Sequence, residues 1–360
     1  MKRSVALILV LALIATLFTG CVGTTVVVGN CTCPSGSHTQ PSQPQTPNVP
    51  AEGALKTGLS VSTSVKDSKS ATAEAAGSAA YDVTIAAVTV DDKGVIASCV
   101  IDSIPATVAF DANGVITSDL TAAIKTKNEL GDDYGMVAWG GAIAEWDAQV
   151  AAVAQYAVGK TVEQLKNGDI DMTTGVAKDG TDLKSSATIY LAGYVYAIEA
   201  AVNNAEHLGA QAGDTLVLST LPSIKSSVSA TAEAAGTAQL DADIVALTKK
   251  GDKITSCYLD SVQAKVAFDA TGTITTDLTA KIKTKNELGS DYGMVAWGSA
   301  IAEWDAQAAA FAAYVTGKTA AEVAGIAITE TTKPADGTDL SASVTIAIGG
   351  FQALIAKAMA

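Results

Sequence analysis

Apolar and polar residues alternate in part over three stretches, residues 81–90, 94–102 and 106–110. These stretches are rich in Val, Ile and Thr, and alternation of β-branched residues is typical of strands. The Asp-Ala-Asn-Gly sequence at 111–114 predicts a turn, because Asn-Gly tolerates positive φ angles. A further short strand is expected over 115–117. The pattern therefore predicts a β-rich segment in this part of the chain.

Further along the chain, apolar residues recur with the period of an α-helix, and this predicts a helix over residues 139–158. Its expected apolar face is formed by Ile143, Trp146, Val150 and Val153. A second apolar helical run follows Thr188, and a similar run follows Thr345 near the end of the chain. Strands followed by helices predict an α+β fold class.

The whole pattern occurs twice, because the chain from about residue 55 is a tandem duplication. Residues 125–149 read KTKNELGDDYGMVAWGGAIAEWDAQ, and residues 283–307 differ from them only at Ser290 and Ser299. The sequence ATAEAAG also recurs, beginning at residues 71 and 230. Two long copies predict domains in tandem rather than a solenoid. The expected domains are residues 55–211 and residues 212–360.

The N-terminus predicts a lipoprotein signal peptide over residues 1–20. Lys2 and Arg3 precede an apolar run, residues 4–18, that is too short to be a membrane-spanning helix. The following Thr-Gly-Cys resembles a bacterial lipobox, which implies cleavage before Cys21 and a diacylglyceryl group on its sulfur. The two acyl chains would hold the protein on the extracytoplasmic face of the cell membrane. The alternative is an ordinary secretory signal with an incidental cysteine.

Residues 21–54 are expected to form a tether behind the lipidated cysteine. Five of the eight prolines of the chain lie here, among Ser, Gln, Thr and Gly. Such a composition buries too little apolar surface to fold. Cys31 and Cys33 in the tether are weak evidence for a metal site, and a local disulfide or two idle thiols explains them better.

The formal net charge of −14 argues against binding to nucleic acid through a basic patch. Arg3 is the only arginine, so the mature chain has no guanidinium group for phosphate recognition. A phosphate group would need backbone N–H groups, lysine or a covalent bond. The two histidines, His38 and His207, have no counterparts in the other copy, which disfavours a repeated metal site or Ser–His–Asp site. Acid–base catalysis by carboxylates stays open.

Two further features are expected to be structural. Gly-Lys-Thr at 159–161 is not a phosphate-binding loop, because Ala154 stands where that motif needs glycine and the preceding element is helical. Cys99 and Cys257 occupy equivalent predicted strands, one in each copy, and are interpreted as small buried residues rather than a disulfide.

An acidic turn that ends in threonine occurs once in each copy. Residues 179–188 read DGTDLKSSAT and residues 336–345 read DGTDLSASVT. If each threonine begins a helix, its hydroxyl and the neighbouring N–H groups face the same small volume, where the helix dipole favours an anion. Asp182 and Asp339 are expected to cap the turns. On spacing alone, an ordinary N-capped helix after an Asp-Gly turn explains the pattern better than a flavin site does.

The turn resembles the Asp-x-x-Ser-Gly-Ala-Thr signature of FMN-binding domains, in which a flavin transferase esterifies FMN from FAD onto the last threonine. The first copy departs from this signature only by serine in place of glycine. The second departs at three positions, Ala342, Ser343 and Val344. The resemblance implies covalent FMN on Thr188 and Thr345. It also implies that the surrounding turn contributes to cofactor binding through Asp182, Ser185, Ser186, Asp339 and Ser343.

The Asn-Glu-Leu-Gly-x-Asp-Tyr-Gly-Met stretch at 128–136 and 286–294 adds to this resemblance. Together with the Glu-Trp helix that follows, it is similar to the two-domain flavin-carrying lipoproteins of Gram-positive extracellular electron transfer. Aromatic and thioether side chains of this block could line the isoalloxazine ring, although they are as readily explained as core residues. They are Tyr134, Met136, Trp139, Tyr292, Met294 and Trp297.

The resemblance implies a redox carrier rather than an enzyme with its own substrate. Its electrons would come from a membrane NADH dehydrogenase or quinone and pass to extracellular acceptors or a partner reductase. One alternative is a surface-binding or structural lipoprotein without flavin, which the altered signature of the second copy favours. Another is a reductase whose bound FMN acts directly on a small molecule.

Overall fold

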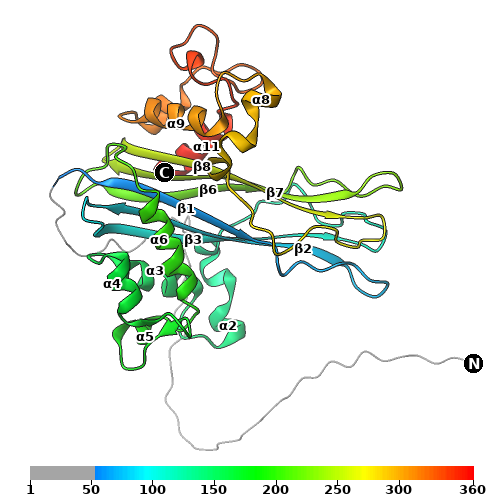
Figure 1. The fold of residues 1–360 in the computed structure, drawn as a ribbon, viewed down its shortest axis with the longest axis horizontal. Coiled ribbons are helices and arrows are strands. Elements are labelled where there is room, and N and C mark those ends of the chain that lie inside the picture. Colours follow the sequence, from blue (N-terminus) through cyan, green and yellow to red (C-terminus); the bar gives the residue numbers. More distant parts are fainter. Residues whose placement is uncertain (1–52) are drawn as a thin grey trace, which may run out of the picture. The chain divides into compact units, whose positions relative to one another are not determined.

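Two antiparallel sheets of three strands form the centre of residues 53–360, the part of the chain that the computed structural model describes (Figure 1). The predicted signal peptide, Cys21 and almost all of the predicted tether, with Cys31 and Cys33, lie outside the described residues. Helices and strands are both abundant, which confirms the mixed α+β class.

Each sheet is a meander in which consecutive strands are neighbours. The first sheet consists of β1 (Lys56–Ser64), β2 (Gly77–Val90) and β3 (Ile96–Phe110). The second sheet consists of β6 (Thr215–Ser223), β7 (Gly236–Lys250) and β8 (Lys253–Phe268). A small hairpin of β4 (Ile170–Asp171) and β5 (Val176–Ala177) belongs to the first repeat.

The helices follow each sheet in the same order along the chain. In the first repeat they are α1 (Lys127–Leu130), η1 (Gly131–Tyr134), α2 (Met136–Gly140), α3 (Trp146–Ala157), α4 (Val162–Asn167), α5 (Asp182–Ser186) and α6 (Ala192–Asn203). In the second repeat they are α7 (Lys285–Leu288), η2 (Gly289–Tyr292), α8 (Met294–Gly298), α9 (Trp304–Val315), α10 (Ala320–Ala324), η3 (Leu340–Ala342) and α11 (Gly349–Met359). None of the helices in residues 53–360 is long and apolar enough to cross a membrane.

Three sequence predictions need correction. The expected strands 94–102 and 106–110 are one strand, β3, and residues 115–117 contribute only a single bridge, between Ile116 and Phe110. The helix expected over 139–158 is two helices, because Gly141 takes a positive φ of 61° that ends α2 before α3 begins. Ile143 therefore lies outside α3 and is exposed.

The alternation along the strands gives each sheet two apolar faces. In β2, Val83 and Ile85 face a core that contains residues of both sheets, whereas Ala86 and Val88 face the helices of their own repeat. The two sheets therefore pack face to face. Helices cover the outer face of each sheet, with α3 and α6 on the first and α9 and α11 on the second. The described residues thus form four layers, helix–sheet–sheet–helix.

The contacts between the two sheets are reciprocal, as in an isologous dimer interface. Phe110 and Phe268, equivalent residues of the two repeats, stack with ring centroids 4.1 Å apart and planes 2° from parallel. The Ala71 N–H donates to the Gly272 carbonyl at 2.8 Å, and the equivalent Ala230 N–H donates to the Gly114 carbonyl at 2.8 Å. The turn predicted at 111–114 is therefore part of the interface between the repeats.

A buried carboxylate attaches the first helix of each repeat to the sheet. Asp102 Oδ1 accepts the N–H groups of Ser103 at 2.7 Å and Asn128 at 3.1 Å. In the second repeat, Asp260 accepts equivalent bonds from Ser261 and Asn286. Burial raises the pKa of both carboxyl groups to about 6.

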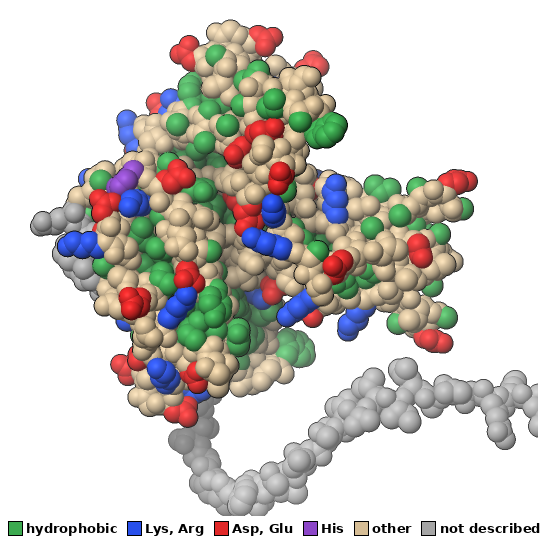
Figure 2. All heavy atoms as spheres, viewed as in Figure 1, with side chains coloured by type: hydrophobic (Ala, Val, Ile, Leu, Met, Phe, Trp, Pro, Cys, Tyr) green, Lys and Arg blue, Asp and Glu red, His purple; other side chains and the backbone are tan. Residues whose placement is uncertain are grey.

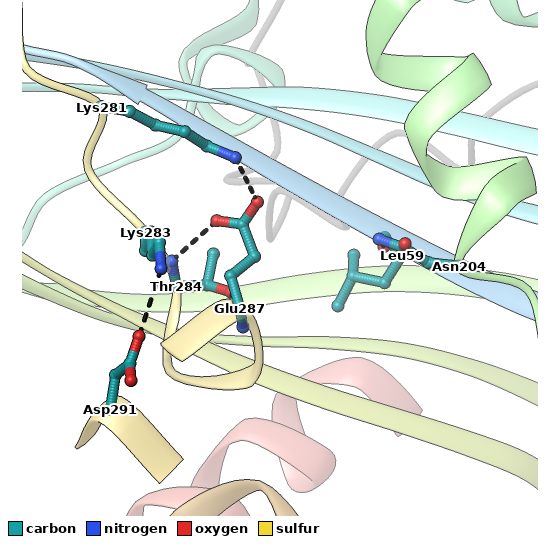
Figure 3. Close-up of polar contacts among 7 residues, drawn as sticks. All are labelled: Leu59, Asn204, Lys281, Lys283, Thr284, Glu287 and Asp291. Atoms are coloured by element: carbon teal, nitrogen blue, oxygen red, sulfur yellow. Dashed lines mark hydrogen bonds and ion pairs between the residues drawn. The ribbon is translucent and has the colours of Figure 1, made fainter. Parts of the chain in front are cut away.

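The start of α7 has further polar contacts at the surface (Figure 3). Thr284 and Glu287 form a capping box, in which each side chain binds the backbone N–H of the other residue. Lys281 Nζ lies 2.8 Å from Glu287 Oε1, and Lys283 Nζ lies 3.4 Å from Asp291 Oδ2. Figure 2 shows Lys side chains scattered among Asp and Glu over the visible face. The capping box fixes the N-terminus of α7, whereas these exposed ion pairs add little to stability.

Replacing Asp102 with Asn should change the pH dependence of folding. The carboxyl pKa is raised in the folded state, so its contribution to stability is present at pH 4 and is lost as the pH rises through 6. From pH 4 to 7 the free energy of unfolding of the wild type should therefore fall by up to about 3 kcal/mol relative to that of Asp102→Asn. Urea denaturation at several pH values measures this difference.

Asp260→Asn should behave in the same way, because its carboxyl group has the same burial and the same backbone donors. Asp92→Asn is the control, since Asp92 is exposed and its pKa is lowered, chiefly by a hydrogen bond from Lys56. A free-energy difference between wild type and Asp102→Asn that is constant from pH 4 to 7 would contradict this account of the buried carboxyl group.

Candidate functional site

The side chain of Gln149 on α3 holds the threonine of the first repeat. Gln149 is fully buried, and its Oε1 accepts the Thr188 N–H at 2.8 Å and the Thr188 hydroxyl at 3.3 Å. Its Nε2 donates to the Ala144 carbonyl at 2.7 Å. One carboxamide group therefore joins the backbone at Thr188 to the segment that leads into α3.

The second repeat has the same arrangement around Gln307 on α9. Gln307 Oε1 accepts the Thr345 N–H at 2.7 Å, the Thr345 hydroxyl at 3.2 Å and the Ile346 N–H at 3.2 Å. Its Nε2 donates to the Ala302 carbonyl at 2.8 Å. The sequence between the glutamine and the threonine differs greatly between the repeats, yet both glutamines make the same two contacts to the threonine and the same bond to the segment before the helix.

The prediction that these threonines begin helices is wrong. α6 begins at Ala192, four residues after Thr188, and α11 begins at Gly349, four residues after Thr345. The backbone N–H of each threonine is already bonded to glutamine, so it is not part of a helix N-terminus. The expected anion site at a helix dipole is therefore absent at Thr188 and Thr345.

The predicted aspartate caps are also wrong. Thr181 is the N-cap of α5, and its hydroxyl accepts the Lys184 N–H at 3.3 Å. In the second repeat Thr338 accepts the Ser341 N–H at 3.3 Å, while Asp339 makes no side-chain cap bond. Asp182 and Asp339 are both inside or beside the turn, but neither carboxylate shapes it through a cap.

The serines predicted near the cofactor bind the turn itself. Ser185 and Ser186 donate to the Asp182 carbonyl at 2.7 and 3.3 Å, and Ser343 donates to the Leu340 carbonyl at 3.3 Å. All three residues are exposed. They lie within the same surface turn as the threonines, where their hydroxyl oxygens remain able to accept further hydrogen bonds.

The predicted ring-lining residues fall into two groups. Tyr134 and Met136 are half-buried against the helical core of the first repeat, as Tyr292 and Met294 are in the second. The ammonium group of Lys127 lies 5.3 Å from the centre of the Tyr134 ring. All four residues therefore pack against the helical core of their own repeat. In contrast, Trp139 and Trp297 are 90% and 91% exposed.

A glutamate fixes the loop that carries each tryptophan. The Glu145 carboxylate accepts the N–H groups of Met136 at 2.7 Å and Val137 at 2.9 Å, which are the first two residues of α2. Glu303 makes the same two bonds to Met294 and Val295. The loop between Met136 and Glu145 is therefore closed at its base.

Sequence reasoning missed Gln149, Gln307, Glu145 and Glu303, although a signal was present. Both polar residues of each repeat lie in the Glu-Trp-Asp-Ala-Gln sequence, which ends the block that is nearly identical in the two copies. Four positions separate the glutamate from the glutamine, so both side chains project from the same face at the start of the helix.

The two sites differ in one coupled pair of residues. In the first repeat the Tyr190 ring covers Gly175, where an added Cβ would lie 1.9 Å from the ring. In the second repeat these positions are Ala347 and Thr332, and Thr332 keeps a positive φ of 58°. An exposed tyrosine therefore lies two residues beyond Thr188, and its counterpart beyond Thr345 is alanine.

Among residues 53–360 there is no group of three His, Cys, Asp or Glu side chains that could hold a metal ion. Cys99 and Cys257 are buried, and burial raises the pKa of each thiol to about 12.

No family model matches the chain, and neither a curated protein nor a solved structure matches it significantly.

Replacing Gln149 with Leu should loosen only the Thr188 site. The Thr188 N–H would lose its protein acceptor, and one hydrogen bond has a net value of about 1 kcal/mol. Amide hydrogen exchange at Thr188 should accelerate by about five-fold, the ratio that corresponds to this energy at 25 °C. Exchange resolved by residue, by NMR or by mass spectrometry of overlapping peptides, measures this change.

The second repeat is an internal control for this experiment. Exchange at Thr345 should be unchanged in Gln149→Leu and should accelerate in Gln307→Leu. Equal acceleration at both threonines in either variant would mean that the glutamine stabilises the whole chain rather than its own threonine.

Proposed function

We propose that the chain is a lipid-anchored electron carrier outside the cell membrane, with FMN joined by a phosphoester to Thr188 and to Thr345. The observation that supports this proposal most is that both threonines are held at the surface by the same glutamine contacts. The fold needs no threonine at this place, so its presence in both repeats, exposed at Thr188 and half-buried at Thr345, favours a use for the hydroxyl group.

The surroundings of the hydroxyl group fit such a bond. Thr188 is exposed, and its Oγ1 donates to a neutral amide oxygen through a long contact of 3.3 Å. Esterification would replace the hydroxyl proton and remove only this weak contact, while the N–H bond at 2.8 Å would keep the backbone in place. The covalent bond also removes the need for an arginine to hold the phosphate.

The modification would be carried out by a flavin transferase with FAD as the donor. The threonine oxygen would form a bond to the phosphorus of the FMN half of FAD, and the P–O–P bond would break. AMP would leave, and the hydroxyl proton would pass to the transferase or to water. Gln149 would position the hydroxyl group through its amide oxygen, but an amide is too weak a base to take the proton.

The attached FMN would supply reversible uptake of electrons, and the chain would hold and expose it. A membrane NADH dehydrogenase or quinone is the proposed donor, and extracellular acceptors or a partner reductase would receive the electrons. A covalent bond and a lipid anchor at Cys21 serve the same purpose outside a cell, because a released cofactor or carrier would be lost by dilution.

A second function, a surface-binding lipoprotein without flavin, is favoured by one feature of the second repeat. Thr345 is half-buried whereas Thr188 is exposed, and the turn before Thr345 is a short 3₁₀ helix in place of α5. This difference predicts slower modification at Thr345 if both threonines are substrates, and none if the second repeat has lost the function.

Substitution of the threonines separates these functions. After production of the chain with a flavin transferase and FAD, we expect Thr188→Ala and Thr345→Ala each to retain one flavin and the double variant to retain none. Absorbance of the denatured, desalted protein measures covalent flavin per chain, because any dissociated flavin is removed.

Thr181→Ala and Thr338→Ala are matched controls. These threonines lie in the same turns, and their hydroxyl groups accept backbone N–H groups of the turn rather than contact the glutamines. They should keep both flavins while losing roughly 1 kcal/mol of stability each. A double variant of Thr188 and Thr345 that retains the wild-type flavin content would rule out these attachment points.

A further inference from the structure

Each repeat presents one tryptophan whose indole ring is almost completely exposed although its loop is fixed. Trp139 is 90% exposed and Trp297 is 91% exposed. The loop of the first repeat is closed by two hydrogen bonds to Glu145, and the backbone N–H of Trp139 donates to the Gly135 carbonyl at 2.9 Å. Because the ring is exposed, its packing contributes little to the stability of the fold.

The orientation of the indole ring is set by glycine. Gly135 has a φ of 80°, and a Cβ added there would lie 2.3 Å from Trp139 Cδ1. Gly293 has the same relation to Trp297, at 2.4 Å. The five-membered part of each indole therefore lies against the glycine backbone, and most of the ring stays open to solvent.

The tryptophan loop is joined directly to the threonine site. Glu145 closes the loop, and Gln149, one turn later on the same helix, bonds both the Ala144 carbonyl and the Thr188 N–H. The exposed indole and the exposed hydroxyl therefore belong to one rigid unit at the start of α3. The same unit is present at the start of α9.

The size and placement of the two indoles argue against a protein or a bilayer as the occupant. Near Trp139 in the sequence the other large exposed apolar side chains are Val137 and Ile143, whereas each partner contributes roughly 20–30 residues to a standard protein interface. The α2 and α8 loops belong to the helical layers on opposite faces of the paired sheets, as Figure 1 shows. One flat membrane cannot cover both.

A planar aromatic ligand fits these observations better. Offset stacking on an indole adds about 0.5–1.5 kcal/mol beyond the buried area, and it needs only one open ring face. The ligand must be available to both repeats, because the loop is the same in both. Tyr190 is a less suitable platform, because the second repeat has Ala347 in its place.

We propose that Trp139 and Trp297 each support the isoalloxazine ring of the flavin attached to the same repeat, in place of the half-buried Tyr134, Met136, Tyr292 and Met294. This inference rests on the proposed function. It assigns packing to the tyrosines and methionines, and ring stacking to an exposed residue that sequence reasoning could not distinguish from them.

The two repeats allow a crossed experiment on the complete chain. In a Thr345→Ala background the flavin is carried on Thr188 alone, and in a Thr188→Ala background it is carried on Thr345 alone. Trp139→Ala, Trp297→Ala and Tyr190→Ala are introduced into each background. Intact mass gives the flavin content, and flavin fluorescence per bound flavin reports stacking, since an indole in contact with isoalloxazine quenches its emission.

With flavin on Thr188, Trp139→Ala should raise the emission several-fold, whereas Trp297→Ala and Tyr190→Ala should leave it unchanged. With flavin on Thr345, Trp297→Ala should have the effect and Trp139→Ala should not. Trp139→Phe should keep part of the quenching. The circular dichroism of all variants should match that of the wild type, because neither indole is part of the core.

Three different results would overturn the proposal, and they can be told apart. Flavin attached to the threonine but equally emissive in wild type and Trp139→Ala would reject the tryptophan platform and leave the proposed function standing. A rise in Tyr190→Ala instead would assign the platform to Tyr190. No mass addition to a folded chain with an active transferase would reject the proposed function and the inference together.

Discussion

The hydrogen bonds made by Glu145 and Gln149 at the start of α3 hold the candidate site together, and those of Glu303 and Gln307 do so in the second repeat. Each pair links the tryptophan loop and the helix that directly follows it to the segment that contains the threonine, which lies 39 residues after Gln149 in the first repeat. Gln149 is fully buried, so its amide has few alternative partners and the contacts have a defined geometry. These bonds act together with the core of the repeat, in which Ala187 and Leu191, on either side of Thr188, are buried in the same cluster as Trp146 of α3.

The packing of the two sheets decides how the two sites are arranged. The inner faces of the sheets are occupied by their shared core and by the Phe110–Phe268 stack, so only the outer faces can carry the helices that build a site. Each repeat therefore presents its threonine in its own helical layer. Under the proposed function, the chain would offer two separate flavins with similar surroundings rather than one joint redox centre.

The sequence predicted the mixed α+β class well, because this class follows from patterns that extend over many residues. It failed where a short interruption breaks a pattern. Residues 103–105, which include Pro105, separated the two strands expected within β3, and Gly141 divided the helix that the apolar period joined. The contact between Gln149 and Thr188 spans 39 residues, so no local spacing could predict it. The near-identity of the two copies marked the block that contains Gln149 but not the role of that residue.

The central claim is that both threonines carry FMN, and intact-mass spectrometry of the wild-type chain tests it most directly. The protein would be produced with an active flavin transferase and FAD, and the modified peptides would then be sequenced. The account predicts two additions of the mass of FMN less water, one on Thr188 and one on Thr345. A folded chain without any such addition, or with additions at other residues, would contradict it.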